Sequence, residues 1–338
     1  MIKKVLISIS ILGLLAFLSV VYMKNQVEDY INQPLNIESE TLYTLSSGAS
    51  FNRTLAQLSE QNIIHDSLAS KIVSRLYPQY TSVKAGTYLI KPGNTLAETL
   101  TLFVSGDEHH FSLTFVEGST FKEWRKWLNE APNLTHDTQV LTEAEIAAEL
   151  GIEQQKLEGL FLAETYYYTF GMSDLEILKK AHKQLTQSLE LAWAKKQNNL
   201  PLKDSYEALI LASIIEKETA VESERRRVSS VFVNRLNKGM RLQTDPTVIY
   251  GMGDKYDGDI RKKDLRTPTP YNTYTINGLP PTPIAMPGKA SIEAAVNPEA
   301  SKYLYFVASG KGGHVFTTNL KAHNRAVRAY LKELRKKK

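Results

Sequence analysis

An apolar run near the start of the chain is its clearest hydrophobic pattern. Residues 5–22 contain only apolar residues, serine, glycine and one tyrosine, without a charge. A helix rises about 1.5 Å per residue and a bilayer hydrocarbon core is about 30 Å thick, so the run is near the short end of the spanning range. Lys3 and Lys4 precede it, and no A-x-A-like cleavage site follows it. The pattern predicts an uncleaved transmembrane helix over 5–22, with a removed signal peptide as the alternative.

Beyond this run, the apolar positions become sparse and then periodic. Residues 23–40 are largely polar, which predicts a juxtamembrane spacer. Apolar residues at helical spacing over 51–64 and 68–76 predict two short helices. Alternation over 85–90 predicts a strand, followed by a turn and a further helix. These elements predict a small α+β domain over 41–110.

The rest of the chain, residues 111–338, carries more elements than one small domain holds. A strand is predicted at the start, and a capped amphipathic helix follows Ser119-Thr120. Strand-like pieces and Pro/Gly turns are predicted over 243–288. We expect a larger, mixed α/β domain here, and an α+β fold for the whole chain. Further helices are predicted over 143–150, 175–189, 206–218, 223–236 and from 322, with a strand over 303–308.

Composition narrows the possible functions. Of the 338 residues, 42% are hydrophobic and 23% are charged, which is typical of folded protein. The absence of cysteine excludes disulfides, thiol nucleophiles and cysteine-bound zinc, and export without disulfides suits a bacterial envelope protein. The formal charge of +5 forms no compact basic stripe, so nucleic-acid binding is not expected.

Two motifs are set aside. The glycine-rich segment 310–314 lacks the spacing of a phosphate-binding loop, which leaves a tight turn as its interpretation. The histidines at 109, 110, 314 and 323 lack the spacing of a metal site. We therefore expect neither a metal nor a cofactor.

Two carboxylates stand two residues apart at the end of one predicted apolar helix. At about 100° per residue, Glu216 and Glu218 point to opposite sides, and Glu218 lies toward the apolar face that includes Leu211 and Ile214. Burial would raise the pKa of Glu218, as a glycosidase requires of the acid that protonates its leaving oxygen. The alternative is a buried glutamate paired with an arginine of the run 225–227.

A set of sequence blocks follows the same order and spacing as in a known family. The chain resembles the endolytic murein transglycosylases, the MltG or YceG-like family. The blocks are A-S-I-I-E-K-E at 212–218, V-F-V-N-R-L at 231–236, L-Q-T-D-P-T-V-I-Y at 242–250, Y-N-T-Y at 271–274 and G-L-P-P at 278–281.

The resemblance covers nearly the whole chain and implies an architecture. It implies a single anchor, a LysM-like glycan-binding subdomain over 41–110 and a catalytic domain over 111–338. Gly93 to Leu96 resembles the start of a LysM module, and an unrelated small α+β domain is the alternative. The family's catalytic residue is the second glutamate of E-K-E, which falls on Glu218.

The resemblance also implies a reaction. Glu218 would cleave the bond between N-acetylmuramic acid and N-acetylglucosamine and leave a 1,6-anhydromuramoyl end. If Asp245 faced Glu218 as a nucleophile or held a water, hydrolysis would be the better account; Asp245 before Pro246 is also a candidate turn former. A non-catalytic peptidoglycan-binding scaffold is the second class of function considered.

Four residues are candidates for binding the saccharide. These are Gln243, Tyr271, Asn272 and Tyr274, since amides bond sugar hydroxyls and aromatic faces cover sugar rings. Core packing is the alternative for the tyrosines, and turn chemistry is the alternative for Asn272.

The implied partners are peptidoglycan strands and, by resemblance, penicillin-binding synthases. The implied location is the bacterial inner membrane, with residues 1–4 cytoplasmic and the catalytic domain periplasmic.

Overall fold

The computed structural model describes residues 2–337. Residue 1 of the predicted segment 1–4 and residue 338 of the predicted segment 111–338 lie outside the described residues. The chain forms two compact units. The first contains the chain up to Phe111 together with Thr169–Gly171, and the second contains Ser112–Tyr168 and the chain from Met172 on.

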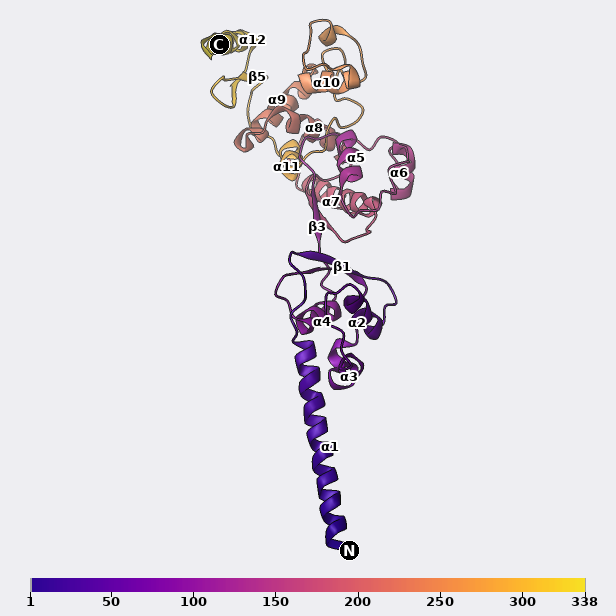
Figure 1. Ribbon diagram of the computed structural model, residues 1–338. Coiled ribbons are helices and arrows are strands. Elements are labelled where there is room, and N and C mark those ends of the chain that lie inside the picture. Colours follow the sequence, from indigo (N-terminus) through magenta and orange to yellow (C-terminus); the bar gives the residue numbers. More distant parts are fainter. Residues whose placement is uncertain (1, 338) are drawn as a thin grey trace. The chain divides into compact units, whose positions relative to one another are not determined.

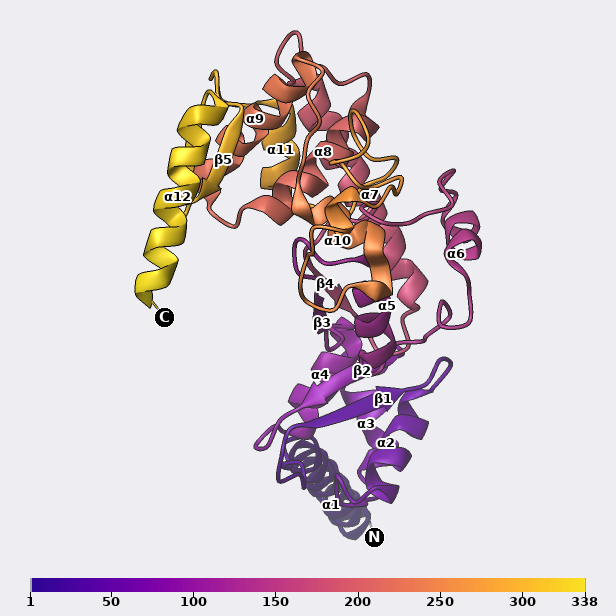
Figure 2. The same cartoon turned by 90° about the horizontal axis from the view of Figure 1, so that it is seen from above.

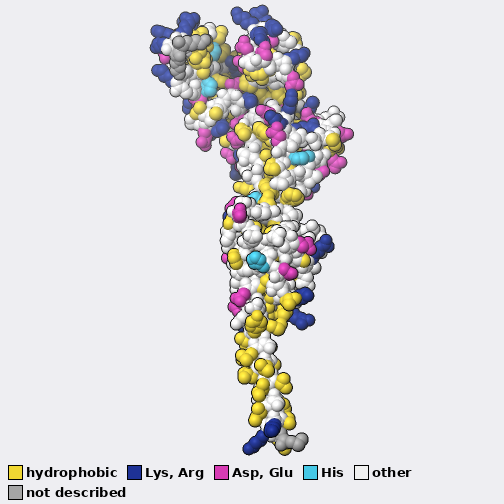
Figure 3. Space-filling view, viewed as in Figure 1, with side chains coloured by type: hydrophobic (Ala, Val, Ile, Leu, Met, Phe, Trp, Pro, Cys, Tyr) yellow, Lys and Arg dark blue, Asp and Glu magenta, His cyan; other side chains and the backbone are white. Residues whose placement is uncertain are grey.

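Helix α1 (Ile2–Ile31) has the length and composition of a membrane-spanning helix. It contains 30 residues, and its most apolar stretch has a mean hydropathy of 2.5. Apolar side chains cover it, and two lysines lie at its start (Figure 3). This observation supports the predicted anchor, although the helix extends well beyond the expected residues 5–22.

The structure differs from the spacer expected over 23–40. Helix α1 continues into this segment as far as Ile31, and its last turns place Val27, Tyr30 and Ile31 in the core of the first unit, where Leu35 also lies. These positions follow i, i+3, i+4 spacing, so a narrow apolar stripe lies among polar neighbours. Because most residues of the segment are polar, these packed helical turns were not predicted from the sequence.

The first unit packs helices against a two-stranded sheet (Figure 1). The strands are antiparallel, with Thr41 opposite Ile90, and the predicted helices and strand of this unit are confirmed. A capping box of Thr95 and Glu98 starts the last helix, and Gly106 ends it in the left-handed conformation. The elements are β1 (Thr41–Leu45), α2 (Phe51–Glu60), α3 (Ser70–Leu76), η1 (Pro78–Tyr80), β2 (Gly86–Ile90) and α4 (Leu96–Ser105).

The second unit is mainly helical, with two small two-stranded sheets, β3-β4 and β5-β6. Figure 2 shows β5 and α12 side by side, as their contacts confirm. Its elements are β3 (Phe111–Thr114), α5 (Phe121–Glu130), α6 (Glu143–Leu150), β4 (Thr165–Tyr168), α7 (Asp174–Ala194), α8 (Ser205–Glu218), η2 (Glu222–Glu224), α9 (Arg225–Asn237), α10 (Asp245–Met252), η3 (Gly253–Lys255), η4 (Asp264–Arg266), α11 (Lys289–Val296), β5 (Tyr305–Ala308), β6 (His314–Thr317) and α12 (Leu320–Lys337).

The strand-like pieces expected over 243–288 are not formed within this described segment. Helix α10 and the short helices η3 and η4 occupy part of it, and the rest is turns and loops. The β-branched run from Thr247 to Ile249 suggested a strand. However, Pro246 stands in the first turn of α10, where its missing N–H costs nothing.

Helix α8 lies at the centre of the second unit and packs against α7, α9 and α11. Asp204 caps its start by accepting a hydrogen bond from the Glu207 N–H at 2.8 Å, and it ends where Thr219 becomes extended. Every side chain from Ala208 to Ile215 is buried. The helix therefore lacks the single apolar face expected from its sequence, and the burial of its flanking residues does not distinguish Glu218 from Glu216.

Candidate active site

Glu218 lies at the end of α8 and lines a cavity of about 550 Å³. The cavity walls come from α9, the segment 242–245, β5 and α12. Residues far apart in the sequence therefore surround one carboxyl group.

Thr244 is the closest partner of this carboxyl group. Its hydroxyl donates a hydrogen bond to Oε1 of Glu218, although Thr244 stands at the N-cap of α10, where such a hydroxyl usually caps the helix. Its backbone N–H donates to Oγ1 of Thr273 at 3.1 Å, and its carbonyl accepts from Thr247 Oγ1 at 2.7 Å. Thr244, which stands beside Gln243 in the block 242–250, was not among the predicted site residues.

The surroundings of Glu218 favour its protonated form. Burial raises its pKa from 4.5 to about 7; the Thr244 hydrogen bond lowers it, the charge of Asp245 raises it and His314 lowers it. The raised pKa agrees with the expectation from the sequence. A carboxyl group with a pKa near 7 populates both protonation states near neutral pH, as an acid that later acts as a base requires.

Glu216 has a different environment. Its Oε2 accepts a hydrogen bond from the Gly288 N–H at 2.9 Å, and its Oε1 lies 3.8 Å from Nη2 of Arg225. Glu117 lies 4.0 Å from the same guanidinium. Among the described residues, no lysine or arginine pairs with Glu218. The pairing with an arginine of 225–227, which was the alternative for Glu218, is therefore made by Glu216.

Asp245 lines the same cavity as Glu218 and starts α10, consistent with its interpretation as a turn former. Its Oδ1 accepts a hydrogen bond from the Tyr274 hydroxyl at 2.6 Å. Burial, this hydrogen bond and the nearby carboxylates raise the pKa of Tyr274 well above its usual value. Asp245 is thus a charged neighbour of Glu218 with a hydrogen-bond partner of its own.

Two of the four predicted saccharide contacts, Gln243 and Tyr274, line the cavity with Glu218. Gln243 adopts a left-handed backbone conformation with φ of 52°. Its N–H donates to the Thr273 carbonyl at 3.2 Å, and its side-chain oxygen accepts from Nη1 of Arg235 at 3.3 Å. The loop conformation is thereby fixed next to the cavity.

Tyr271 and Asn272 are not among the residues that line this cavity. The Tyr271 hydroxyl hydrogen-bonds Oγ1 of Thr282 at 2.9 Å, and its ring packs edge-on against Tyr250. Asn272 is buried, and its amide donates to backbone carbonyls, including that of Thr267 at 2.7 Å. The structure therefore gives Asn272 the turn chemistry that was its alternative.

Arg235, in the block 231–236, is a cavity residue for which no role was predicted. Its side chain is buried, and it donates to the carbonyls of Leu304 at 2.7 Å and Leu242 at 2.8 Å. Its guanidinium lies 4.9 Å from the ring centre of Tyr305, and burial lowers its pKa. Arg235 thereby ties α9 to two other walls of the cavity.

The C-terminal wall was also missed. His323 from α12 stacks on Tyr305 from β5 at 5.1 Å, and both line the cavity. Beside this wall, Glu224 accepts hydrogen bonds from the N–H of His314 at 2.9 Å and from its Nδ1 at 2.7 Å. In the described part of the chain, no group of three His, Asp or Glu side chains is arranged to hold a metal ion.

The family model described as YceG-like matches residues 43–329, most of the chain. The chain belongs to the YceG-like family. The resemblance drawn from the sequence blocks is therefore confirmed. The crystal structure of a YceG-like protein from Listeria monocytogenes, at 2.6 Å, matches with a TM-score of 0.55 and 29% identity, covering 85% of this chain and 98% of that one. The predicted mixed α+β fold is consistent with this match, while the LysM-like assignment stays a prediction.

Two named relatives are similar to this chain, one over most of its length and one over about half of it. An endolytic murein transglycosylase of Bacillus subtilis (strain 168) is 32% identical over 323 residues, which cover 88% of this chain and 88% of the relative. An endolytic murein transglycosylase of Streptococcus pneumoniae (strain ATCC BAA-255 / R6) is 32% identical over 178 residues, or 51% of this chain and 32% of the relative.

Proposed function

We propose that this YceG-like protein is an endolytic peptidoglycan lytic transglycosylase with Glu218 as its acid and base. The observation that carries the proposal is the environment of Glu218, which lines a cavity without a lysine or arginine partner among the described residues and has a pKa of about 7. The names and extensive similarity of its relatives support the same activity.

The mechanism needs one carboxyl group used twice. Protonated Glu218 gives its proton to the oxygen between N-acetylmuramic acid and N-acetylglucosamine as the bond from that oxygen to C1 breaks. The resulting carboxylate then takes the proton of the muramoyl 6-hydroxyl, whose oxygen forms the new bond to C1. The product is a 1,6-anhydromuramoyl end, and Glu218 is again protonated.

Asp245 is not required as a nucleophile in this mechanism. Its hydrogen bond from Tyr274 and its charge beside Glu218 support an electrostatic role, in which it raises the pKa of the acid. Hydrolysis by a muramidase mechanism is the competing reaction, and a non-catalytic scaffold is the competing class of function.

The four predicted saccharide contacts fall into two pairs, according to whether they line the cavity of Glu218. Gln243 and Tyr274 line the cavity, so we assign them to the glycan strand. Tyr271 and Asn272, proposed as contacts from the sequence, are better assigned to holding the loop that carries Tyr274.

The location follows from the anchor. We propose a single-pass protein of the bacterial inner membrane, with the short N-terminus cytoplasmic and the catalytic domain over 111–338 periplasmic. A LysM-like subdomain over 41–110 would bind glycan. Penicillin-binding synthases are the proposed partners, and cutting nascent strands beside them would end strand elongation.

The direct test is glycan cleavage by the detergent-solubilised full chain and its Glu218→Gln variant. We expect the variant to lose at least about a hundredfold in rate, as expected when a general acid–base group is removed. Glu190→Gln, at an exposed position of α7, is the matched control and should retain parental activity. Equal cleavage by parent and Glu218→Gln would refute the assignment, and the absence of cleavage by the parent in a permissive assay would favour the scaffold.

A further inference from the structure

Helix α3 lies at the end of the first unit from which the apolar part of α1 emerges. It contacts α1, and Figure 1 shows it beside the last turns of that helix, whereas β1 lies at the other end of the unit. The buried residues of α1 are Val27, Tyr30 and Ile31, and they share one core with Ala69 and Val73. Helix α3 therefore packs on this end of α1. The proposed mechanism of glycan cleavage does not use it.

The length of α1 sets the height of α3 above the hydrocarbon core of a membrane. The uncharged run ends at Tyr22, and Val27 is the first buried residue of α1 after it. A helix rises about 1.5 Å per residue, so Val27 stands about 7 to 8 Å beyond the run. The headgroup layer on each side of the hydrocarbon core is about 5 to 8 Å thick. Elements packed at Val27 therefore begin at the outer edge of the lipid headgroups.

One side of α3 is apolar and basic, and it faces away from the core. Leu68, in the turn that leads into the helix, is 79% exposed, and Leu76, its last residue, is 46% exposed. Lys71 and Arg75 are also exposed, and Ile72 is half-buried. These five positions follow i, i+3, i+4, i+7, i+8 spacing, so they form one face of the helix. We call it the outward face of α3.

The two cations of the outward face have no partner within the first unit. Among the described residues, neither Lys71 nor Arg75 forms an ion pair or a side-chain hydrogen bond. Long basic side chains rest their stems on apolar surface while their charges reach phosphate oxygens. Neighbouring segments carry acidic residues, so this end of the unit has no excess of positive charge and its apolar side chains select the partner. These acidic residues are Glu28, Asp29, Glu60 and Asp66.

The lipid layer around α1 is the nearest partner for the outward face. Figure 3 shows hydrophobic side chains together with Lys and Arg at this end of the first unit. A membrane around the apolar run of α1 brings its headgroups to the level of Val27, where α3 packs. Exposed leucines are unfavourable in water, and helices that lie in a membrane interface combine such side chains with Lys and Arg.

We propose that the outward face of α3 rests in the lipid headgroup layer of the membrane that α1 crosses. The inference rests on the proposed anchor and is independent of the catalytic role of Glu218. A second attachment beside α1 restricts the tilt of the first unit about its anchor. The unit is thereby held against the membrane surface.

The test measures the depth of single labelled positions. The chain contains no cysteine, so one introduced cysteine carries the only label. The full chain is labelled at Leu68→Cys with an environment-sensitive fluorophore. It is then reconstituted into vesicles of phosphatidylethanolamine and phosphatidylglycerol, with or without a phospholipid that carries a nitroxide near the top of its acyl chain. We expect blue-shifted emission and loss of most of the fluorescence to the nitroxide.

Three further labels complete the design. Leu76→Cys should behave like Leu68→Cys, because both leucines are on the outward face. Leu42→Cys replaces an exposed leucine of β1 and is the matched control; its label should emit as in water and lose no fluorescence to the nitroxide. Ser19→Cys lies in the apolar run of α1 and should be quenched strongly, which establishes that the anchor is inserted.

Three outcomes would overturn the inference. They are emission as in water from the labels at 68 and 76, blue-shifted emission from them without quenching, which identifies a protein as the cover, and equal quenching at 68 and 42. None of these outcomes involves glycan cleavage, so the proposed activity of Glu218 is unaffected by them. An unquenched label at position 19 would instead refute the anchor, and the inference with it.

Discussion

At the residue scale, the environments of Glu216 and Glu218 differ although both stand at the end of α8. Glu216 receives a hydrogen bond from Gly288 and lies beside Arg225, while Glu218 receives one from Thr244 in the cavity. The carboxyl group of Glu216 is therefore held by structural contacts, whereas the pKa of Glu218 is raised to about 7. We regard this difference as the physical basis for assigning catalysis to Glu218.

The raised pKa of Glu218 predicts a pH-dependent cost in stability. Between pH 4.5 and 7 the folded state holds a proton that the unfolded state releases, so the free energy of unfolding falls as pH rises through this window. Glu218→Gln cannot ionise. At pH 8 we expect the variant to be more stable than the parent by up to about 3 kcal/mol, and at pH 5 by less than about 1 kcal/mol.

Urea unfolding followed by tryptophan fluorescence would measure this difference, because all three tryptophans lie in the second unit. Burial also raises the pKa of Glu158, to about 8. Its effect on the free energy of unfolding is the same in the parent and the variant, so it cancels in the comparison. Glu190→Gln is the control. A stability difference that does not widen between pH 5 and pH 8 would contradict the assigned pKa.

Asp245→Asn separates the two possible roles of Asp245. If its charge only raises the pKa of Glu218, its removal lowers that pKa, and the fall of kcat/KM above about pH 7 moves to lower pH. Asparagine still offers an oxygen to Tyr274. A loss of activity of a thousandfold or more at every pH would instead identify Asp245 as a nucleophile or water-holding base.

Also at the residue scale, the sequence predicts a role for Glu218 and none for Thr244, its hydrogen-bond partner. The catalytic role of Glu218 stays a prediction. The family resemblance and the helical position both point to this residue, but the helical argument assumed one apolar face, whereas α8 is buried along most of its length. Thr244 could not be recognised, because a threonine before Asp-Pro predicts a helix cap. Only the fold shows that its hydroxyl turns to another helix.

At the element scale, helices with regular apolar spacing were predicted well, and elements shaped by distant contacts were not. The part of α1 from residue 23 to Ile31 was not predicted as a helix, because only a few of its side chains enter a core formed mostly by later residues. Helix α10 was misread because its β-branched residues favour a strand locally, whereas Pro246 starts a helix.

The packed end of α1 leads to a prediction for the first unit. Ile31→Ala should destabilise this unit by about 2 to 5 kcal/mol, because it removes a buried side chain and leaves a cavity. Hydrogen exchange of the β1 and β2 amides would report the change as faster exchange. Glu28→Ala, on the exposed side of the same helix, should leave exchange unchanged. Similar effects of both substitutions would show that α1 is not part of the core.

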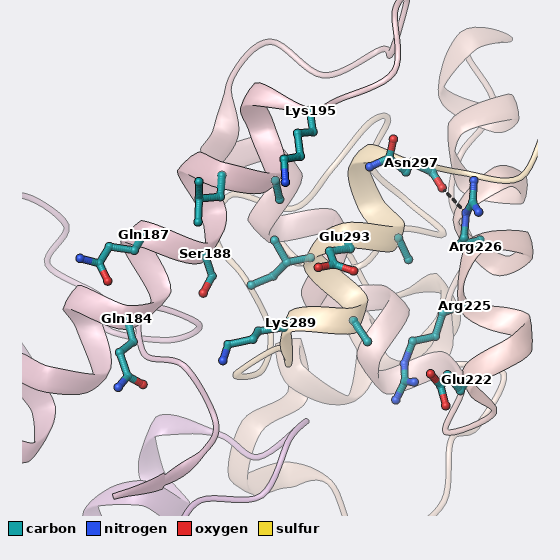
Figure 4. Close-up of a pocket in the computed structure, with 15 residues that line it drawn as sticks. Gln184, Gln187, Ser188, Lys195, Glu222, Arg225, Arg226, Lys289, Glu293 and Asn297 are labelled. Carbon is teal, nitrogen blue, oxygen red and sulfur yellow. Dashed lines mark hydrogen bonds between the residues drawn. The ribbon is translucent and has the colours of Figure 1, made fainter.

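At the scale of the whole molecule, the order of segments was accessible from the sequence, but the cavities were not. The anchor, a small following region and a larger region were all predicted from hydrophobic patterns, although their boundaries stay predictions. The cavity of Glu218 joins α8 to β5 and α12, and another cavity, of about 940 Å³, joins α7 to α9 and α11 (Figure 4). Such juxtapositions depend on tertiary packing that local periodicity does not encode.

The central claim is that the protein is a lyase dependent on Glu218, and the chemistry of the new glycan end tests it most directly. Purified peptidoglycan would be digested by the full chain in water enriched in ¹⁸O, and the fragments would be examined by mass spectrometry. We predict muramoyl ends that are lighter by one water than reducing ends, carry no ¹⁸O, and are absent with Glu218→Gln. Reducing ends that carry ¹⁸O would contradict the account and identify the reaction as hydrolysis.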